Sequence, residues 1–263
     1  MKPNLCAAVL SSVALVASAI AAEPEHQLFS QVLAAHVKAG RVDYHGLRAD
    51  PRLPRYLEQL AATDPDRLAS DQDRLALWLN AYNAYTLQLI VDRQPAKSIT
   101  EIGSGGLVLG SLLKTTAWDI PYATVGGRKY TLNQIEHEVI RAQFQDARTH
   151  FALNCASRSC PILPTAAFEA SSLDEQLEEQ GRLFLRDSTR NRFDLATKTA
   201  HLSRIFKWYR KDFGATDRDA LLNAAQYAAP DVRAAITADP NAWTVRYLAY
   251  DWTLNSLEKP AAP

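Results

Sequence analysis

Apolar residues recur at helical spacing over several stretches of the chain. The strongest pattern covers residues 71–93, where large side chains repeat every three or four positions. Further apolar residues widen the stripe, and a helix that is apolar around so much of its circumference is usually buried. The sequence therefore predicts a long central helix that begins at Asp71 and ends before Pro95.

Weaker signals predict shorter elements around this helix. Helices are expected at residues 25–39, 51–62, 134–144, 173–187, 205–213 and 217–227. Strands are expected at residues 122–125 and 129–132 around a Gly-Gly turn, and at 150–154, 191–195, 199–202 and 247–252. Residues 103–110 form a glycine-rich connector that can serve as a lid. The mixture predicts a single, predominantly helical α+β domain with a small, largely antiparallel sheet.

The first residues have the features of a secretory signal. Lys2 precedes an apolar run at residues 5–20, and Ala19 and Ala21 have the spacing that signal peptidase recognises. We therefore expect residues 1–22 to be removed on export. The remainder is then a single globular domain at residues 23–258 with a disordered tail at 259–263, in the periplasm or outside the cell.

Composition narrows the classes of partner. The 29 basic and 29 acidic side chains balance, which gives no electrostatic reason to expect nucleic acid as a partner. No stretch after the signal is apolar for long enough to form an integral membrane segment. The glycine-rich connector matches neither a phosphate loop nor the dinucleotide fingerprint, and no cofactor is expected. The partner left open is an unknown small molecule, peptide or protein.

The most informative segment is residues 150–164, which contains both cysteines of the expected mature chain. Cys155 and Cys160 follow the predicted strand at 150–154, and the end of a strand holds side chains rigidly beside a loop. A cysteine placed there can be a nucleophile if an imidazole lowers the pKa of its thiol. His137 and His150 are the nearest candidate bases in the sequence.

Two other interpretations of these residues stay open. Export to an oxidising compartment favours a disulfide between Cys155 and Cys160. A metal site made of both cysteines with His137 and His150 is the third interpretation, although the spacing of the cysteines is not that of common zinc modules. In an oxidising compartment the disulfide is the default state, and catalysis by a free thiol is less common.

Asn80 and Asn83 form a second group of interest on the predicted central helix. They lie three residues apart and so share one helix face. A buried amide must be satisfied by partners, so these residues either orient groups at a pocket wall or pin neighbouring loops. Two further segments, Trp118-Asp119 and Tyr250-Asp251-Trp252, can line a pocket, although aromatic residues at such spacing more often belong to a core.

Five segments together resemble the domain-of-unknown-function 547 family. These segments are Leu77–Ala84, Leu132–His137, His150–Pro161, Leu202–Phe213 and Tyr250–Asn255. The resemblance implies a shared site around Asn80, Glu136, His137, Cys155 and Cys160. It implies no known reaction. The mixture of Cys, His, Asn and Glu is similar in kind to papain-like and transglutaminase-like enzymes, with His137 preceding Cys155 where papain has the reverse order.

Two hypotheses of function follow. In the first, the protein is an exported cysteine hydrolase or acyl transferase: Cys155 attacks a carbonyl, His137 acts as its base, and Glu136 or Asn80 orients the histidine. The candidate binding residues around this centre are Asn83, His150, Trp118 and Cys160, with no metal. In the second, the protein is a non-catalytic periplasmic binding or scaffold domain with a Cys155–Cys160 disulfide.

Overall fold

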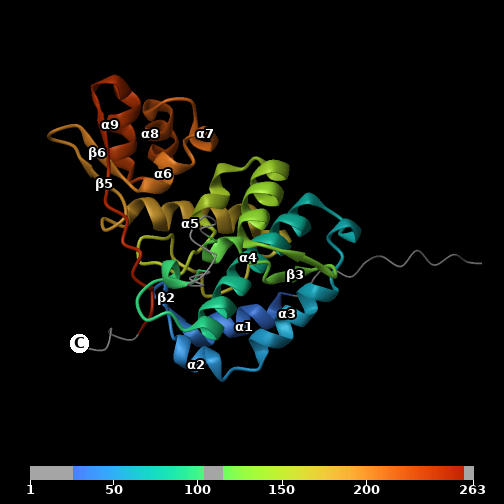
Figure 1. Ribbon diagram of the computed structural model, residues 1–263. Helices are drawn as coiled ribbons and strands as arrows, with labels where there is room; N and C mark the ends of the chain where they lie inside the picture. Colours follow the sequence, from blue (N-terminus) through green and yellow to red (C-terminus); the bar gives the residue numbers. More distant parts are fainter. Residues whose placement is uncertain (1–25, 104–114, 258–263) are drawn as a thin grey trace, which may run out of the picture.

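The computed structural model describes residues 26–103 and 115–257, and one long helix lies at its centre. This helix, α4 (Asp71–Arg93), begins with a capping box in which Ser70 and Asp73 exchange side-chain and backbone hydrogen bonds. Its residues are buried on nearly every side. Figure 1 shows the other elements arranged around α4, as predicted for a helix without a polar face.

The first half of the chain packs around α4 as one hydrophobic core. It contains α1 (Gln27–His36), the short strands β1 (Val37–Lys38) and β2 (Arg41–Val42), α2 (Tyr44–Arg48), α3 (Arg52–Ala62), η1 (Pro65–Arg67), η2 (Ile99–Glu101) and η3 (Ala117–Asp119). Strands β3 (Ala123–Val125) and β4 (Arg128–Tyr130) form the expected hairpin. Both glycines of its turn, Gly126 and Gly127, have positive φ, which is the conformation that favours glycine there.

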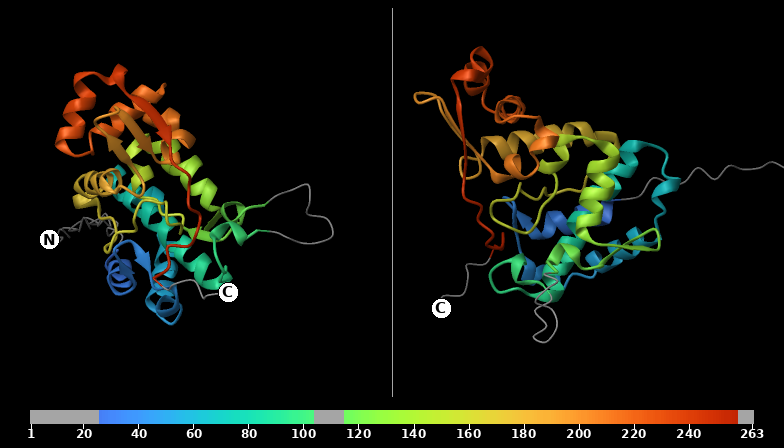
Figure 2. Two further views of the ribbon diagram at one scale, coloured as in Figure 1. Left: turned by 90° about the vertical axis from the view of Figure 1, so that its left-hand side faces the viewer. Right: turned by 45° about the horizontal axis from the view of Figure 1, so that its top comes forward.

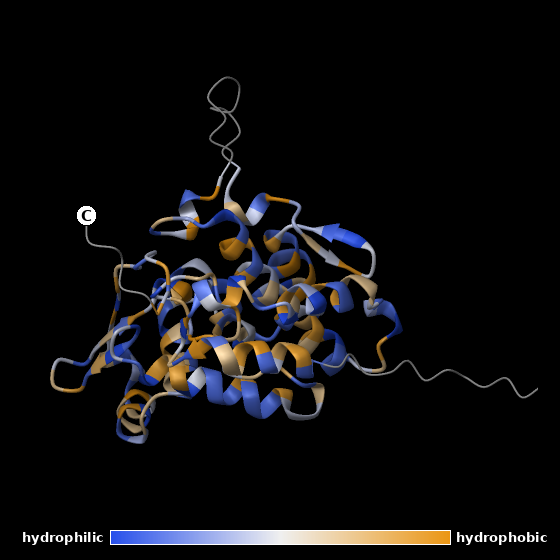
Figure 3. Ribbon diagram, turned by 90° about the horizontal axis from the view of Figure 1, so that it is seen from below, coloured by the Kyte–Doolittle hydropathy of each residue, from blue (hydrophilic) through white to orange (hydrophobic). Residues whose placement is uncertain are grey.

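The middle of the chain adds helices to the opposite side of α4. Thr131 and Gln134 form a capping box ahead of η4 (Gln134–Phe144), which is wound as a π-helix. Two 3₁₀ turns follow, η5 (Ala147–Phe151) and η6 (Ala170–Ser172), and then α5 (Leu173–Arg186). Viewed from below, the helices turn hydrophobic residues inward and hydrophilic residues outward (Figure 3).

The last third of the chain forms a second hydrophobic core. It contains α6 (Arg204–Trp208), α7 (Arg210–Phe213), α8 (Asp217–Ala225), α9 (Pro230–Ala238), η7 (Pro240–Ala242) and a sheet of β5 (Arg192–Asp194), β6 (Thr199–Leu202) and β7 (Thr244–Tyr247). Strand β6 pairs antiparallel with β5 and parallel with β7, because the helices form a crossover between β6 and β7.

Residues 248–257 connect the second core back to the first. This segment descends from the second core towards β2 (Figures 1 and 2). Backbone hydrogen bonds join Asn255 to Val42, Leu254 to Lys97 and Thr253 to Arg158, at 2.8–2.9 Å between nitrogen and oxygen. The two cores are therefore fastened together by the end of the described chain as well as by α5.

The predicted fold class is confirmed: the protein has a predominantly helical α+β fold with small sheets. The β structure is divided into three separate small sheets rather than one. The papain-like or transglutaminase-like resemblance stays a prediction, as does the single domain at residues 23–258. The proposed signal at 1–22, the tail at 259–263 and residues 104–110 of the predicted connector lie outside the described residues. None of the described helices has the length and hydropathy needed to cross a membrane.

Several element predictions need correction. Residues 150–154 were expected as a strand, but they form the end of η5 and a loop. The first helix ends at His36 because the chain turns into a hairpin at Gly40. Helix α9 was not predicted, and the last strand precedes the expected 247–252 segment. Ser172 stands before α5 without capping it through its side chain.

Candidate functional site

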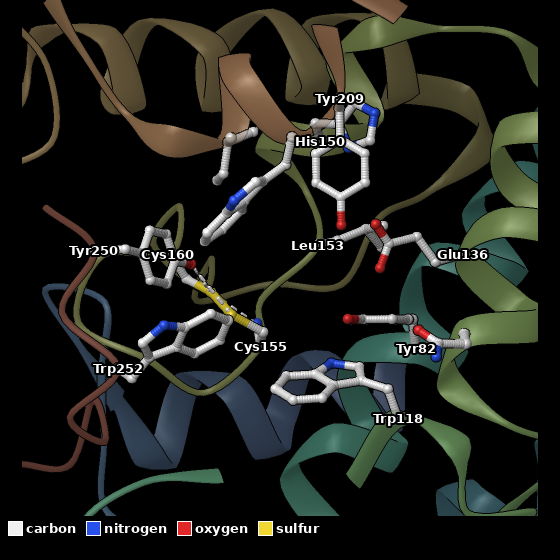
Figure 4. Close-up of a pocket in the computed structure, with 13 residues that line it drawn as sticks. Tyr82, Trp118, Glu136, His150, Leu153, Cys155, Cys160, Tyr209, Tyr250 and Trp252 are labelled. Atoms are coloured by element: carbon white, nitrogen blue, oxygen red, sulfur yellow. Dashed lines mark hydrogen bonds between the residues drawn. A yellow bond between two sulfur atoms is a disulfide. The ribbon is translucent and has the colours of Figure 1, made fainter. Parts of the chain in front are cut away.

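A cavity of about 220 Å³ lies where the two hydrophobic cores meet. Its walls come from α4, η3, η4, α6, the loop after η5 and the C-terminal segment. The lining residues are Tyr82, Trp118, Asn133, Glu136, His150, Leu153, Cys155, Cys160, Ile205, Trp208, Tyr209, Tyr250 and Trp252. Figure 4 shows them arranged around an open centre. We call this space the central pocket.

One wall of the central pocket is the loop at residues 155–160. Cys155 and Cys160 form a disulfide across this loop, with Cα atoms 6.2 Å apart. The Asn154 side chain holds the start of the loop by accepting a hydrogen bond from the Ala156 N–H and donating one to the Pro161 carbonyl, at 2.9 and 2.8 Å. The loop is thus a rigid wall, fixed by a covalent bond and by buried amide hydrogen bonds.

Aromatic rings form the wall beside the disulfide. The ring centroids of Trp208, Tyr250 and Trp252 lie 4.6–5.7 Å from one another, and Trp118 meets Trp252 edge-on at 5.7 Å. The Tyr250 hydroxyl lies 3.3 Å from the sulfur of Cys155 and 3.2 Å from that of Cys160. Burial raises the pKa of Tyr250, so this hydroxyl remains protonated beside the disulfide.

The facing wall is polar and centres on Glu136. This side chain is only 6% exposed, and its carboxylate interacts with the hydroxyls of Tyr82 and Tyr209. The Tyr209 hydroxyl and the carboxylate point toward each other in Figure 4. Burial raises the pKa of both tyrosines, and the neighbouring carboxylate raises it further. Both hydroxyls therefore stay protonated beside Glu136.

A second buried polar group stands behind Tyr209. The His150 ring stacks on the Tyr209 ring with centroids 4.0 Å apart, and its Nε2 lies 2.6 Å from a carboxylate oxygen of Asp212. Arg141 binds the same carboxylate through two nitrogens, at 2.6 and 2.9 Å. The hydrogen bond from His150, together with Arg141, holds the pKa of Asp212 below its usual range. This cluster fixes Tyr209, and through it the polar wall.

Some predicted site residues meet in the central pocket. Glu136, His150, Trp118, Cys155 and Cys160 all line it. Glu136 was expected to orient a histidine, whereas it lies at the cavity wall beside Tyr82 and Tyr209. His150 is paired with Asp212 across 62 residues of sequence.

His137 lies outside the central pocket. It is exposed on η4, and its Nδ1 is 2.9 Å from an Arg141 nitrogen. The expected pairing of His137 with Cys155 is therefore not formed, because adjacent residues on a helix project in different directions. The metal-site interpretation fails for the same reason, and also because the two sulfurs are bonded to each other.

Asn80 and Asn83 act on the backbone of distant loops. Asn80 is fully buried and exchanges two hydrogen bonds with the backbone of Phe168. Asn83 donates to the Ala152 carbonyl and accepts from the Asn154 N–H, both at 2.9 Å. Of their two expected roles, pinning neighbouring loops is the one these contacts fulfil.

Several lining residues were not singled out from the sequence. Tyr82 was counted only as part of the central helix, and Trp208 and Tyr209 only within a helix. Tyr209 and Asp212 lie inside the 202–213 segment that carries part of the family resemblance. That segment was the one available signal, since neither residue has a diagnostic spacing.

The fold and the pocket define a helical α+β protein with an aromatic-lined site. The family model described as "Protein of unknown function, DUF547" matches residues 65–185, and this segment of the chain belongs to that family. The matched segment contains α4, Glu136 and both cysteines. No curated protein and no solved structure matches the chain.

Proposed function

We propose that this chain is an exported, non-catalytic binding domain whose central pocket holds a small organic cation, a molecule with a quaternary ammonium or protonated amine. Export to the periplasm or beyond rests on the signal expected at residues 1–22. The observation that carries the binding proposal is the buried Glu136 carboxylate at the wall of an aromatic cavity.

The charge of Glu136 supports a cationic ligand. Among the residues that the structure describes, no basic group lies within ion-pair distance of its carboxylate, and Arg141 is engaged by Asp212. Buried charges in proteins are paired or strongly hydrogen-bonded. The hydroxyls of Tyr82 and Tyr209 hold the carboxylate, and a bound cation completes its charge balance.

The facing aromatic wall suits the rest of such a ligand. Trp118, Trp208, Tyr250 and Trp252 offer ring surfaces, and a cation within about 6 Å of a ring centroid is attracted by the ring's quadrupole. A cavity of about 220 Å³ is smaller than those that hold drug-sized molecules. The ligand is therefore a small metabolite.

The cysteines are better suited to a structural role than to nucleophilic catalysis. A thiolate is the nucleophile in cysteine enzymes, and the sulfur of Cys155 is bonded to that of Cys160. The proposed base, His137, faces Arg141 instead. These contacts favour the second of the two hypotheses of function.

The test compares choline with its neutral isostere, in which a tert-butyl group replaces trimethylammonium. We expect choline or tetramethylammonium to quench the fluorescence of the pocket tryptophans, with the neutral isostere at least about tenfold weaker. Glu136→Gln keeps the shape and removes the charge, and we expect it to weaken choline binding by a similar factor. Glu138→Gln, an exposed carboxylate on the same helix, is the matched control and should bind as the wild type.

Two results would contradict the proposal. One is equal binding of choline and the neutral isostere, which would leave only an apolar pocket. The other is no saturable binding of either cation up to about 10 mM by a folded protein with an intact disulfide.

A further inference from the structure

A second, larger cavity of about 530 Å³ lies on the other side of the 155–160 loop. It shares no lining residue with the central pocket. Its walls are formed by Tyr44, His45, Arg48, Ile90, Val91, Gln94, Pro95, Ala96, Lys97, Arg158, Thr253, Leu254 and Ser256. We call it the basic cavity, because its lining contains Arg48, Lys97, Arg158 and His45 but no acidic residue.

The positive charges of the basic cavity are not neutralised by ion pairs. Within residues 26–103 and 115–257, no carboxylate lies within 4 Å of a side-chain nitrogen of Arg48, Lys97 or Arg158. Arg48 donates a hydrogen bond to the Gln94 side-chain oxygen at 2.9 Å, which leaves its charge uncompensated.

Arg158 carries the clearest sign of a missing partner. Its Nε is buried and has no hydrogen-bond partner, and an unsatisfied buried donor is costly in a folded protein. Its backbone N–H is fixed to the Thr253 carbonyl at 2.8 Å, so the residue is anchored. The terminal nitrogens of its guanidinium can bind a phosphate or carboxylate through two parallel hydrogen bonds.

Two carboxylates lie near the basic cavity, and each accepts a hydrogen bond from a backbone N–H group. Asp251 interacts electrostatically with Arg158 and Arg41, yet its side chain accepts a hydrogen bond from the Thr253 N–H at 2.9 Å. Glu101 accepts one from the Lys97 backbone N–H at 3.1 Å. Neither carboxylate lines the basic cavity.

Part of the remaining lining is apolar. Ile90 and Val91 are buried side chains of α4, and Pro95 and Leu254 complete this surface. A volume of about 530 Å³ lies in the range of cavities that hold organic ligands. The cavity therefore offers an apolar surface for a ligand body and basic groups for an anionic head.

We propose that the basic cavity binds a small organic anion, with its phosphate or carboxylate group on Arg158 and its apolar part against Ile90 and Leu254. Arg48 and Lys97 supply further positive charge at the rim. The site is separate from the central pocket, and the proposal does not depend on what that pocket binds. Arg158 lies between the two disulfide cysteines, so one loop contributes to both cavities.

The proposal is tested by measuring the affinity of the protein for phenyl phosphate, benzoate and benzyl alcohol with isothermal titration calorimetry. The three probes share an aromatic body and differ in their head group. We expect saturable binding of at least one anion, and at least about tenfold weaker binding of the neutral alcohol. Binding of phenyl phosphate alone identifies a phosphate ester as the ligand class, and binding of benzoate alone identifies a carboxylate.

Substitutions locate the site. Arg158→Gln should weaken anion binding about tenfold or more, whereas Arg67→Gln, at an arginine whose side chain is 81% exposed, should leave it unchanged. If Arg158→Gln does not fold, Arg48→Gln and Lys97→Gln together should give the same loss. Equal binding of the alcohol and the anions, no anion binding, or anion binding that survives these substitutions in folded protein would overturn the proposal.

Discussion

His150 Nε2 lies 2.6 Å from a carboxylate oxygen of Asp212, and this contact joins the loop before the disulfide to the second hydrophobic core. The histidine side chain is almost fully buried, whereas that of Asp212 is 25% exposed. Arg141 binds the same carboxylate. Arg141 and His150 therefore both pair with Asp212, which lies more than 60 residues away in the sequence. This cluster supports Tyr209, which in turn holds Glu136.

Asp212→Asn should destabilise the protein by about 1–2 kcal/mol near neutral pH, since a charge-assisted hydrogen bond at a partly exposed site is lost. The folded-state pKa of Asp212 is lowered, so its contribution is fully present above the unfolded value near 3.9 and is lost as the pH falls below it. Denaturant unfolding of both proteins should show a difference near pH 6 that shrinks toward pH 2. A constant difference over this range would contradict the assignment.

His26 should make stability depend on pH in a different window. Burial lowers its pKa from 6.5 to about 4, and its Nδ1 is 2.7 Å from the Tyr56 hydroxyl. As the pH falls, His26 is therefore protonated near pH 6.5 in the unfolded chain but only near pH 4 in the folded protein. The free energy of unfolding falls by up to about 3 kcal/mol between pH 7 and 4. His26→Gln can keep a hydrogen bond to Tyr56 without titrating.

The readout is the melting temperature of both proteins at a series of pH values. The slope between pH 7 and pH 4 should be smaller for His26→Gln than for the wild type. Parallel curves would show that His26 is not the group responsible.

Asn83→Ala should lower the free energy of unfolding by about 2–4 kcal/mol, because the substitution leaves two buried backbone groups, at Ala152 and Asn154, without partners. Gln88→Ala is the matched control on the same helix: its exposed hydrogen bond to Asp92 should contribute less than about 0.5 kcal/mol. Urea unfolding measures both. Equal effects of the two substitutions would mean that Asn83 does not hold the loop.

Reduction of the Cys155–Cys160 disulfide should cost about 2 kcal/mol of stability, since the closed loop is short. Alkylation under denaturing conditions, followed by mass spectrometry, should detect these two thiols only after reduction. Cys155→Ala with Cys160→Ala should have the stability of the reduced wild type. Free thiols in protein purified from an oxidising compartment would contradict the disulfide and reopen the case for Cys155 as a nucleophile.

Local signals predicted the fold well where they were sufficient. The stripe along α4 and the Gly126-Gly127 turn each depend on neighbouring residues, so their elements lie close to where the sequence placed them. The cap of α4 is Ser70, one residue before the Asp71 at which the sequence placed the start of the helix. The strand predicted at residues 150–154 was wrong because its backbone depends on a distant residue. Their apolar run resembles a strand, but Asn83, about 70 positions earlier, satisfies the backbone groups that a neighbouring strand would otherwise bind.

The central pocket was only partly predictable. The cysteines and Glu136 lie in a segment whose composition stands out. Tyr209 and Asp212 became visible only with the structure, because they contact His150, which lies 59 and 62 residues away in the sequence. Sequence proximity favoured His137 as the base. The helix turned Glu136, its neighbour, toward the cavity instead.

The return of residues 248–257 to the first core has a consequence for biosynthesis. Tyr250 and Trp252 close the central pocket, and Thr253 and Leu254 line the basic cavity. These residues are translated after every other wall of both cavities. Neither site can therefore be complete while the chain is still emerging from the ribosome.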